Sequence, residues 1–159
     1  CYGREIKDKL ISVIYLDLSN FEIFEKNFKH LNFSYRKGFQ YKNTIILYGK
    51  FILQYGEQDL IKKLMKDYER MRNLSQPQKV NCCGSIFKNP PGYNAWKLIK
   101  SSIDESFYKG PIKLSKKHSN FFENDPNINS DMIILFINQI RERVYKKYNI
   151  NLEPELEIK

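Results

Sequence analysis

The chain has 159 residues, of which 42% are hydrophobic, so it can bury a core and is not expected to be disordered. Its net charge of +9 is compatible with two partners, nucleic acid or a multiply charged anionic small molecule. The lysines are scattered rather than gathered in one block, which favours a solvated surface over a nucleic-acid patch. No apolar run approaches the roughly 20 residues that cross a bilayer, so we expect no membrane partner.

Cysteine and histidine usage bounds the redox setting and the metal chemistry. Three cysteines cannot all pair, and Cys82 and Cys83 are neighbours, so the pattern favours a reducing cytosol over a disulfide framework. With two histidines and no Cys-x-x-Cys motif, the sequence predicts no metal site. The chain begins at Cys1 rather than at a methionine, so we expect a front segment that lies outside these residues.

The first half of the chain predicts strands and then a helix. Residues 10–18, LISVIYLDL, are apolar and β-branched and predict a buried strand. Residues 43–56 predict one long strand or two short ones. Residues 57–73 predict an amphipathic helix with one charged face, and we place a domain boundary after it, near Pro77. The apolar stripe of this helix contains Leu60, Ile61, Leu64, Tyr68 and Met71.

The second half mixes helices and strands, which indicates an α+β fold. Residues 94–103 predict a short helix, and residues 109–124 predict a turn, a short strand and a loop. Residues 129–149 predict a long helix that Ser130 caps. Residues 150–159 predict a final strand, at an edge or with a bulge because of its proline. The expected buried stripe of the long helix is Ile133, Ile137, Ile140, Val144 and Tyr148.

The segment CCGSIFKNPPGYNAW, residues 82–96, sets a serine, a lysine and an asparagine among prolines and glycines. Such a pattern predicts a loop. Taken alone, the loop either connects two elements or presents the hydroxyl of Ser85 and the amide of Asn89 to a ligand.

Five blocks in chain order carry a more specific signal. They are CYGREIKD, SYRKGFQYK, QPQKVNCCGSIFKNP, LSKKHSNFFEN and VYKKYNINLEPELEI. Together they resemble the UDP-N-acetylenolpyruvoylglucosamine reductase family, also called UDP-N-acetylmuramate dehydrogenase. The resemblance spans essentially the whole chain, and the Gly-Ser-x-Phe-Lys-Asn-Pro block is its most specific part. The short gap between FKNP and AWKLI resembles the compact subclass of this family.

The resemblance implies an activity and a domain plan. NADPH would pass a hydride to FAD, and the reduced flavin would reduce the enolpyruvyl ether of a UDP-sugar in peptidoglycan precursor synthesis. Residues 1–77 would be the later part of an FAD-binding α+β domain, 78–149 a small α+β substrate-binding domain, and 150–159 a terminal strand that returns to the flavin. The glycine-rich loop for the flavin pyrophosphate would precede Cys1, so we expect these residues alone to be inactive. We expect the protein to be a cytoplasmic monomer.

The resemblance also assigns three catalytic residues. Arg36 matches an active-site arginine, whose fork of donors suits an enolate-like species. Ser85 matches a serine that donates a proton to carbon. Glu155 matches the glutamate of the terminal strand, which would assist the enolate as a protonated acid or through a water. Glu153 competes for that role, and the Pro-Glu-Leu match favours Glu155.

Binding residues follow from the same blocks. Tyr2 and Gly3, together with Arg36, would contact the cofactor. Asn89 and Ser85 would bind the substrate, as would three groups near its phosphates: His118, Lys117 and, more weakly, Arg72.

One departure from the family bears on this site. Gly38 stands where the family commonly has a serine, which removes a hydroxyl near Arg36.

Two other functions remain open from the residues. The chain could be a non-catalytic remnant that only binds a UDP-sugar. It could also be a basic nucleic-acid-binding module. The net charge and the aromatic content of 14% favour that reading, but no motif supports it.

Overall fold

The computed structural model describes residues 2–39, 41–78 and 80–157. The chain divides into two compact units, Cys1–Met65 and Lys66–Lys159, and the boundary falls within helix α1 (Gln58–Ser75). Helices and antiparallel sheets occur together, so the predicted α+β class is confirmed.

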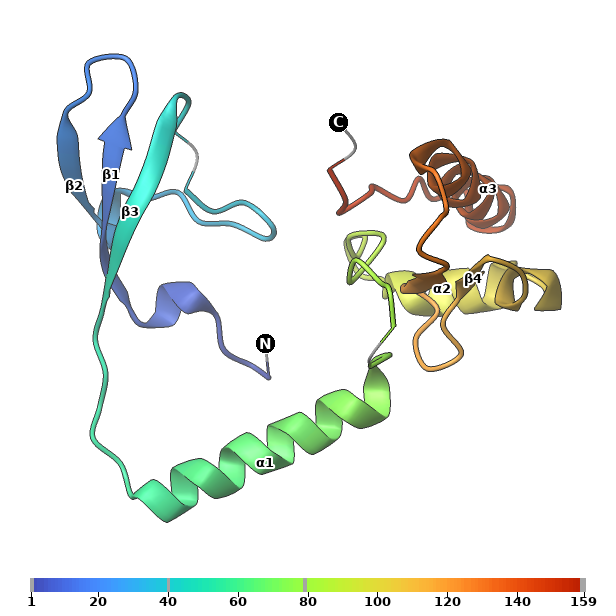
Figure 1. The fold of residues 1–159 in the computed structure, drawn as a ribbon, viewed down its shortest axis with the longest axis horizontal. Coiled ribbons are helices and arrows are strands. Elements are labelled where there is room, and N and C mark those ends of the chain that lie inside the picture. Colours follow the sequence, from blue (N-terminus) through green and yellow to red (C-terminus); the bar gives the residue numbers. More distant parts are fainter. Residues whose placement is uncertain (1, 40, 79, 158–159) are drawn as a thin grey trace. The chain divides into compact units, whose positions relative to one another are not determined.

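The first unit is built on a three-stranded antiparallel sheet with the order β2-β1-β3 (Figure 1). Its strands are β1 (Leu10–Asp17), β2 (Ile23–Asn27) and β3 (Thr44–Phe51). The predicted strand at residues 10–18 is confirmed as the central one, and the segment 43–56 forms one strand rather than two. Strand β2 was not predicted, because it is short and carries adjacent charged residues.

The hydrophobic core of the first unit is small. Leu10, Val13 and Leu31 are buried, and three phenylalanines pack against them. Of two short 3-10 helices, η1 (Ile6–Asp8) precedes β1 and η2 (Phe28–His30) lies between β2 and β3 in the sequence.

Helix α1 is confirmed, and it covers nearly the predicted range. Within the described parts of the chain, however, it buries none of its residues, and its apolar stripe is exposed. An exposed apolar stripe along a helix is typical of a face that packs against another polypeptide surface.

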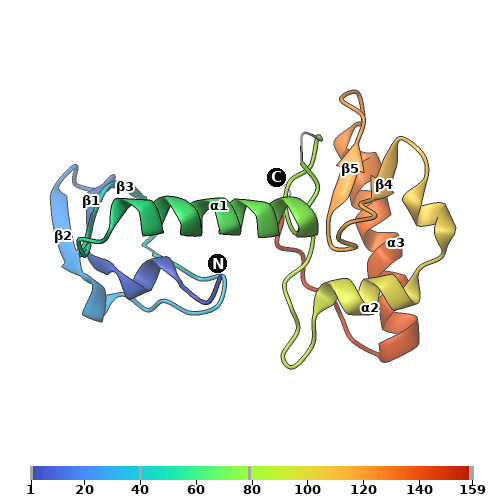
Figure 2. The ribbon, with the colours of Figure 1, turned by 90° about the horizontal axis from the view of Figure 1, so that it is seen from below.

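The second unit contains α2 (Ala95–Ser102), η3 (Glu105–Tyr108), a hairpin and α3 (Ser130–Tyr148). Helix α2 packs against α3, and the hairpin pairs β4 (Ile112–Leu114) with β5 (Phe122–Asn124) (Figure 2). The predicted helix at 94–103 and the short strand are confirmed, whereas the end of the 109–124 segment forms a strand where a loop was expected.

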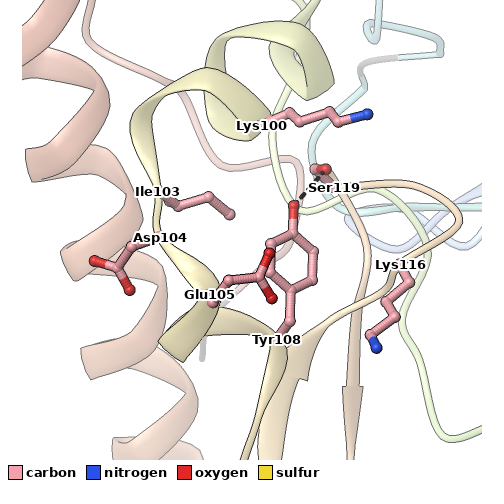
Figure 3. A pocket seen from close by; sticks show the side chains of 7 residues that line it. All are labelled: Lys100, Ile103, Asp104, Glu105, Tyr108, Lys116 and Ser119. Atoms are coloured by element: carbon pink, nitrogen blue, oxygen red, sulfur yellow. Dashed lines mark hydrogen bonds between the residues drawn. The ribbon is translucent and has the colours of Figure 1, made fainter.

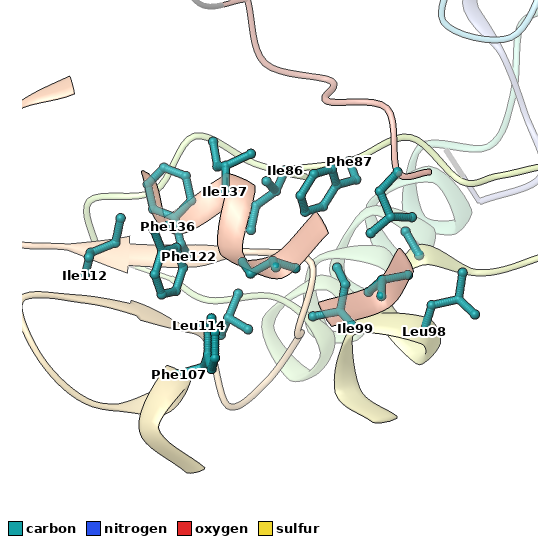
Figure 4. Packing of buried hydrophobic residues seen from close by; sticks show 14 residues of the cluster. Ile86, Phe87, Leu98, Ile99, Phe107, Ile112, Leu114, Phe122, Phe136 and Ile137 are labelled. Atoms are coloured by element: carbon teal, nitrogen blue, oxygen red, sulfur yellow. The ribbon is translucent and has the colours of Figure 1, made fainter. Parts of the chain in front are cut away.

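The core of this unit includes two residues of the proline-rich loop. Ile86 and Phe87 are 0% and 1% exposed, and Figure 4 shows both side chains within the apolar cluster. A loop that buries two large apolar side chains is held at a fixed place on the unit. It is therefore more than a surface connection.

Helix α3 is confirmed with two corrections at the level of single residues. Its N-cap is Asn129, whose side chain accepts from the Met132 amide at 3.0 Å, and Ser130 is the first helical residue. The predicted stripe is buried at Ile137, Ile140 and Val144 and is joined by Phe136, whereas Ile133 is half-buried and Tyr148 is 39% exposed.

The predicted strand at the end of the chain is wrong over its described part. Residues 150–157 make only one isolated bridge, between Pro154 and Phe87. Proline has no amide hydrogen to donate to a ladder, which limits the pairing to a few residues. Residues 158 and 159 lie outside the described residues. No helix in the described ranges is both long and apolar enough to cross a membrane.

Candidate active site

The proline-rich loop and the end of the chain lie side by side in the second unit. The Glu155 amide donates to the Ile86 carbonyl at 2.8 Å, and the Lys88 amide donates to the Glu153 carbonyl at 2.9 Å. These bonds flank the Phe87–Pro154 bridge. Two segments that are 65 or more residues apart in the sequence therefore form one short antiparallel contact.

This contact sets Ile86 opposite Glu155, and Ser85 directly precedes Ile86 in the loop. Both residues are half-buried. Gly84, just before Ser85, has φ +86°, a conformation that favours glycine. Glu153 instead forms an ion pair with Lys88, and its side chain is 70% exposed. Of the two glutamates, Glu155 is the one whose side chain is partly withdrawn from water.

Asn89 has a bond within the protein. Its Oδ1 accepts from the amide of Ala95, the first residue of α2, at 2.9 Å. The side chain thus ties the end of the loop to the start of α2, in the manner of a helix cap.

His118 lies between aromatic side chains. Its ring centroid is 4.8 Å from that of Phe121, in an edge-on arrangement, and 6.1 Å from that of Trp96. Nδ1 accepts from the Asn120 amide at 3.3 Å, so in the neutral ring the proton is on Nε2. Burial lowers the pKa of His118 below its ordinary value. The residue is therefore a neutral donor at pH 7.

Lys117 projects toward the end of α1. Its Nζ donates to the Asn73 carbonyl, in the last turn of that helix, at 2.9 Å. A cation is favourable there because the helix C-terminus carries partial negative charge. A pocket of about 400 Å³ includes Lys117 in its lining, with two further lysines and one glutamate: Lys113, Lys116 and Glu123. Its excess of positive charge suits an anion.

A second pocket, of about 620 Å³, lies on the same unit (Figure 3). Lys100 and Lys116 line it together with Asp104 and Glu105, so its charges balance. The hydrogen bonds that Ser106 donates, and then the nearby Arg143, hold the pKa of Asp104 below its usual range. A pyrophosphate is better matched by the pocket beside Lys117, which has an excess of positive charge, than by this pocket, whose charges balance.

The first unit holds the other three predicted residues, Tyr2, Gly3 and Arg36. Arg36 lies in a tight turn closed by two backbone bonds of 2.9 Å between Ser34 and Lys37. It has φ +57°, and its guanidinium carbon is 5.2 Å from the centre of the Tyr35 ring. A rigid turn therefore carries this side chain.

The turn shares a pocket of about 510 Å³ with residues 4–7. The pocket is lined by more basic than acidic side chains, namely Arg4, Lys7, Arg36 and Lys37 against Glu5. Such a lining fits an anionic part of a dinucleotide cofactor. Tyr2 and Gly3, which precede the pocket, both have positive φ, at +49° and +76°.

Gly38 does not need to be glycine for backbone reasons. Its φ is not in the left-handed region, and a Cβ there would lie 3.5 Å from the Phe33 ring, an ordinary contact. The backbone at this position therefore accommodates a Cβ, so the absence of a serine here has no backbone cause.

Two further properties of the described residues bear on chemistry. Cys82 and Cys83 are free thiols. Within residues 2–39, 41–78 and 80–157, no three or more His, Cys, Asp or Glu side chains gather as metal ligands would.

The fold matches that of a solved enzyme. UDP-N-acetylenolpyruvylglucosamine reductase from Thermus caldophilus matches with a TM-score of 0.77 and 24% sequence identity, over 95% of this chain and 53% of that chain. The chain thus has the α+β fold of part of a known reductase.

Sequence comparison gives the family. The family described as UDP-N-acetylenolpyruvoylglucosamine reductase, C-terminal domain, matches residues 76–159. Reductases of the same name from Exiguobacterium sibiricum and Carboxydothermus hydrogenoformans are 37% and 35% identical to this chain over 158 residues. The chain belongs to the UDP-N-acetylenolpyruvoylglucosamine reductase family. Each match includes 99% of this chain and 52% of the relative, so the chain spans about half the length of these relatives.

The lowered pKa of His118 predicts a pH dependence of stability. An unfolded histidine takes up its proton near pH 6.5, whereas folded His118 takes it up at lower pH, so protonation favours the unfolded chain. The free energy of unfolding should therefore decrease as the pH falls through about 6.5. Urea unfolding at a series of pH values would measure this decrease.

The two histidines of the chain supply a matched pair of variants for this experiment. His118→Gln should remove part of the decrease, and His30→Gln, at an exposed position in η2, should retain it. An equal pH dependence for both variants would contradict the assignment to His118.

Proposed function

We propose that the protein reduces UDP-N-acetylglucosamine enolpyruvate to UDP-N-acetylmuramate, with NADPH as the hydride donor and FAD as the cofactor. It would do so in the cytoplasm, as a monomer, in peptidoglycan precursor synthesis. The single observation that carries the proposal is the pairing of residues 86–88 with 153–155, because it brings the loop that carries Ser85 to the segment that carries Glu155. Both lie within residues 76–159, the part of the chain that the family matches, and the resemblance noted in the sequence would give both a catalytic role.

Reduction of an enolpyruvyl double bond needs a hydride at one carbon and a proton at the other. When bound, FAD would supply the hydride chemistry. Negative charge then develops toward the substrate carboxylate and requires fixed donors. Arg36 would stabilise it with a permanent charge, and Glu155 would assist as a protonated acid or through a water.

Ser85 would donate the proton to the second carbon from its Oγ. A serine hydroxyl is a weak acid, so its contribution depends on fixed placement. The buried Ile86–Phe87 pair and the bonds to residues 153–155 provide that rigidity. The resulting alkoxide would recover its proton from water.

The UDP-sugar would lie on the second unit. His118 would donate from Nε2 to a phosphate oxygen, and Lys117 would add a point charge from the adjoining pocket. Asn89 would contact the sugar near α2. In the first unit, Tyr2, Gly3 and Arg36 would contact FAD, for which the basic pocket beside the turn is a suitable surface. On this proposal the predicted domains, 1–77, 78–149 and 150–159, keep their roles.

The experiment uses the intact protein, anaerobically and with flavin absorbance as the signal. NADPH should bleach the oxidised flavin, and UDP-N-acetylglucosamine enolpyruvate should restore it. UDP-N-acetylglucosamine, which lacks the double bond, should not. A colourless protein, or flavin that returns at the same rate without the enolpyruvyl sugar, would reject the proposal.

A further inference from the structure

The side chain of Asn120 is bonded to both backbone polar groups of one loop residue. The Phe87 amide donates to Oδ1 at 3.0 Å, and Nδ2 donates to the Phe87 carbonyl at 2.8 Å. The Asn120 carbonyl also accepts from the Ile86 amide at 2.8 Å. One residue thus holds two successive residues of the loop, at the position where a neighbouring strand would otherwise pair.

The opposite edge of the same segment is bonded to the end of the chain. Ile86 accepts from the Glu155 amide, and Lys88 donates to the Glu153 carbonyl. Residues 86–88 therefore lie between Asn120 and residues 153–155. The position of Ser85, which directly precedes this segment, therefore depends on the segment staying in place.

The contacts between Asn120 and the loop are buried. Asn120 is 4% exposed, and Ile86 and Phe87 are less exposed still. A buried backbone group that loses its partner costs free energy, and hydrogen bonds are strong in such surroundings. An amide side chain is suited to the position because it carries one acceptor and a donor group. Aspartate would set an oxygen against the Phe87 carbonyl.

The backbone amide of Asn120 acts on a residue outside the loop. Its amide donates to His118 Nδ1, which fixes the proton of the neutral ring on Nε2. The side chain and the carbonyl of Asn120 are thus directed to the loop that carries Ser85, while its amide is directed to His118. A substitution at position 120 changes the side-chain contacts and retains the backbone contacts.

We propose that Asn120 is a positioning residue that holds the loop carrying Ser85 against residues 153–155, so that Ser85 is placed for proton donation. This inference rests on the proposed function. It goes beyond that function because Asn120 acts through the loop backbone and not on the substrate. It requires that the loss of its side chain lowers turnover while substrate affinity, which depends on His118 and its neighbours, is retained.

The kinetic experiment compares Asn120→Asp with Asn124→Asp in the intact protein. Asn124 is a matched control on β5, and its Nδ2 donates to the carbonyl of its neighbour Asp125 at 3.0 Å. For Asn120→Asp, kcat should fall on the order of tenfold to a hundredfold, as for a displacement near 1 Å. KM for the sugar and the rate of flavin reduction by NADPH should stay near the wild-type values. A rise in KM without a fall in kcat would overturn the proposal.

A second readout does not depend on catalysis. Amide hydrogen exchange in Asn120→Asp should accelerate at Phe87 and Glu155, while amides of α3 such as that of Val144 keep their protection. Unchanged exchange at Phe87 would overturn the positioning role even if the enzyme activity is present. If the wild-type protein does not turn over the sugar, the proposed function fails, and exchange still tests the contact.

A second, uncharged substitution tests whether unfolding of the whole unit explains the effect. Asn120→Ser replaces the amide with one hydroxyl, which can donate or accept, and adds no charge. It should show the same local pattern of exchange with a smaller fall in kcat. Loss of protection throughout α3 in both variants would overturn the proposal, because Asn120 would then support the whole unit and not the loop.

Discussion

Arg36→Lys is expected to lower the turnover of the intact protein by about tenfold to a thousandfold, the range typical for the loss of a preorganised donor. Lysine retains the positive charge but cannot present a planar fork of donors to a developing enolate. The tight turn between Ser34 and Lys37 fixes where the side chain starts, so a differently shaped head group cannot be compensated by a shift of the backbone. Steady-state kinetics with saturating NADPH and sugar would measure the loss.

Two further variants separate the side chain from the turn. Arg36 has φ +57°, a conformation that costs a non-glycine residue roughly 1 kcal/mol. Arg36→Gly should therefore retain or raise thermal stability and still lose activity. Arg143→Lys is the matched control and should keep turnover near wild type. Arg143 lies on α3 and forms an exposed ion pair with Asp104. Normal turnover in Arg36→Lys would assign Arg36 a structural role.

The helices could be predicted because each carries its own signal. Residues 57–73 and 129–149 have apolar residues at helical spacing, and the segment before α2 has a proline start. Their ends were less certain, since Asn129 and Ser130 are both good caps and only the observed bond to Met132 selects Asn129. A choice between adjacent capping residues depends on backbone geometry that the sequence does not carry.

The strands of the second unit depend on tertiary contacts. Residues 122–124 form a strand only because residues 112–114 pair with them, and three residues are too few for a periodic pattern. Residues 150–157 have a strand-like composition, but Pro154 limits the pairing to a single bridge with Phe87. Composition predicted that this segment would pair, and the partner and length of the pairing came from the fold.

The candidate site shows the same division. Ser85 and Glu155 were singled out by resemblance, and nothing in their spacing indicates that they meet. Asn120 was missed as a site residue, although it lies in the quoted LSKKHSNFFEN block. The only signal was an asparagine between a polar residue and two phenylalanines, where a buried amide must find partners. Which backbone it bonds is decided by tertiary structure.

Two predicted ligand contacts already have partners inside the protein. The Asn89 side chain accepts from the Ala95 amide at the start of α2, and Lys117 donates to the Asn73 carbonyl at the end of α1. Such bonds are compatible with substrate contact, since a lysine ammonium has three donors. They also mean that substitutions at these positions would change stability and binding together. Ser85 gives a cleaner test of the mechanism.

Ser85→Ala should slow reoxidation of the reduced flavin by the enolpyruvyl sugar by roughly a hundredfold or more, in line with general-acid contributions. Reduction of the flavin by NADPH should proceed at a near-normal rate, because that step needs no proton on the sugar. The change is small and should not disturb the loop, whose position depends on the buried Ile86 and Phe87 side chains. Stopped-flow absorbance times the two half-reactions separately.

Two companion variants decide what the serine does. Ser85→Cys should restore part of the reoxidation rate, since a thiol also donates a proton. Ser130→Ala is a matched control, because Ser130 is exposed at the start of α3 and the cap of that helix is Asn129. Equal slowing of both half-reactions by Ser85→Ala would mean that the serine maintains the shape of the loop. Slowing of neither would remove Ser85 from the mechanism, and the proton would then have to come from another group beside the loop, of which Glu155 is the first to test.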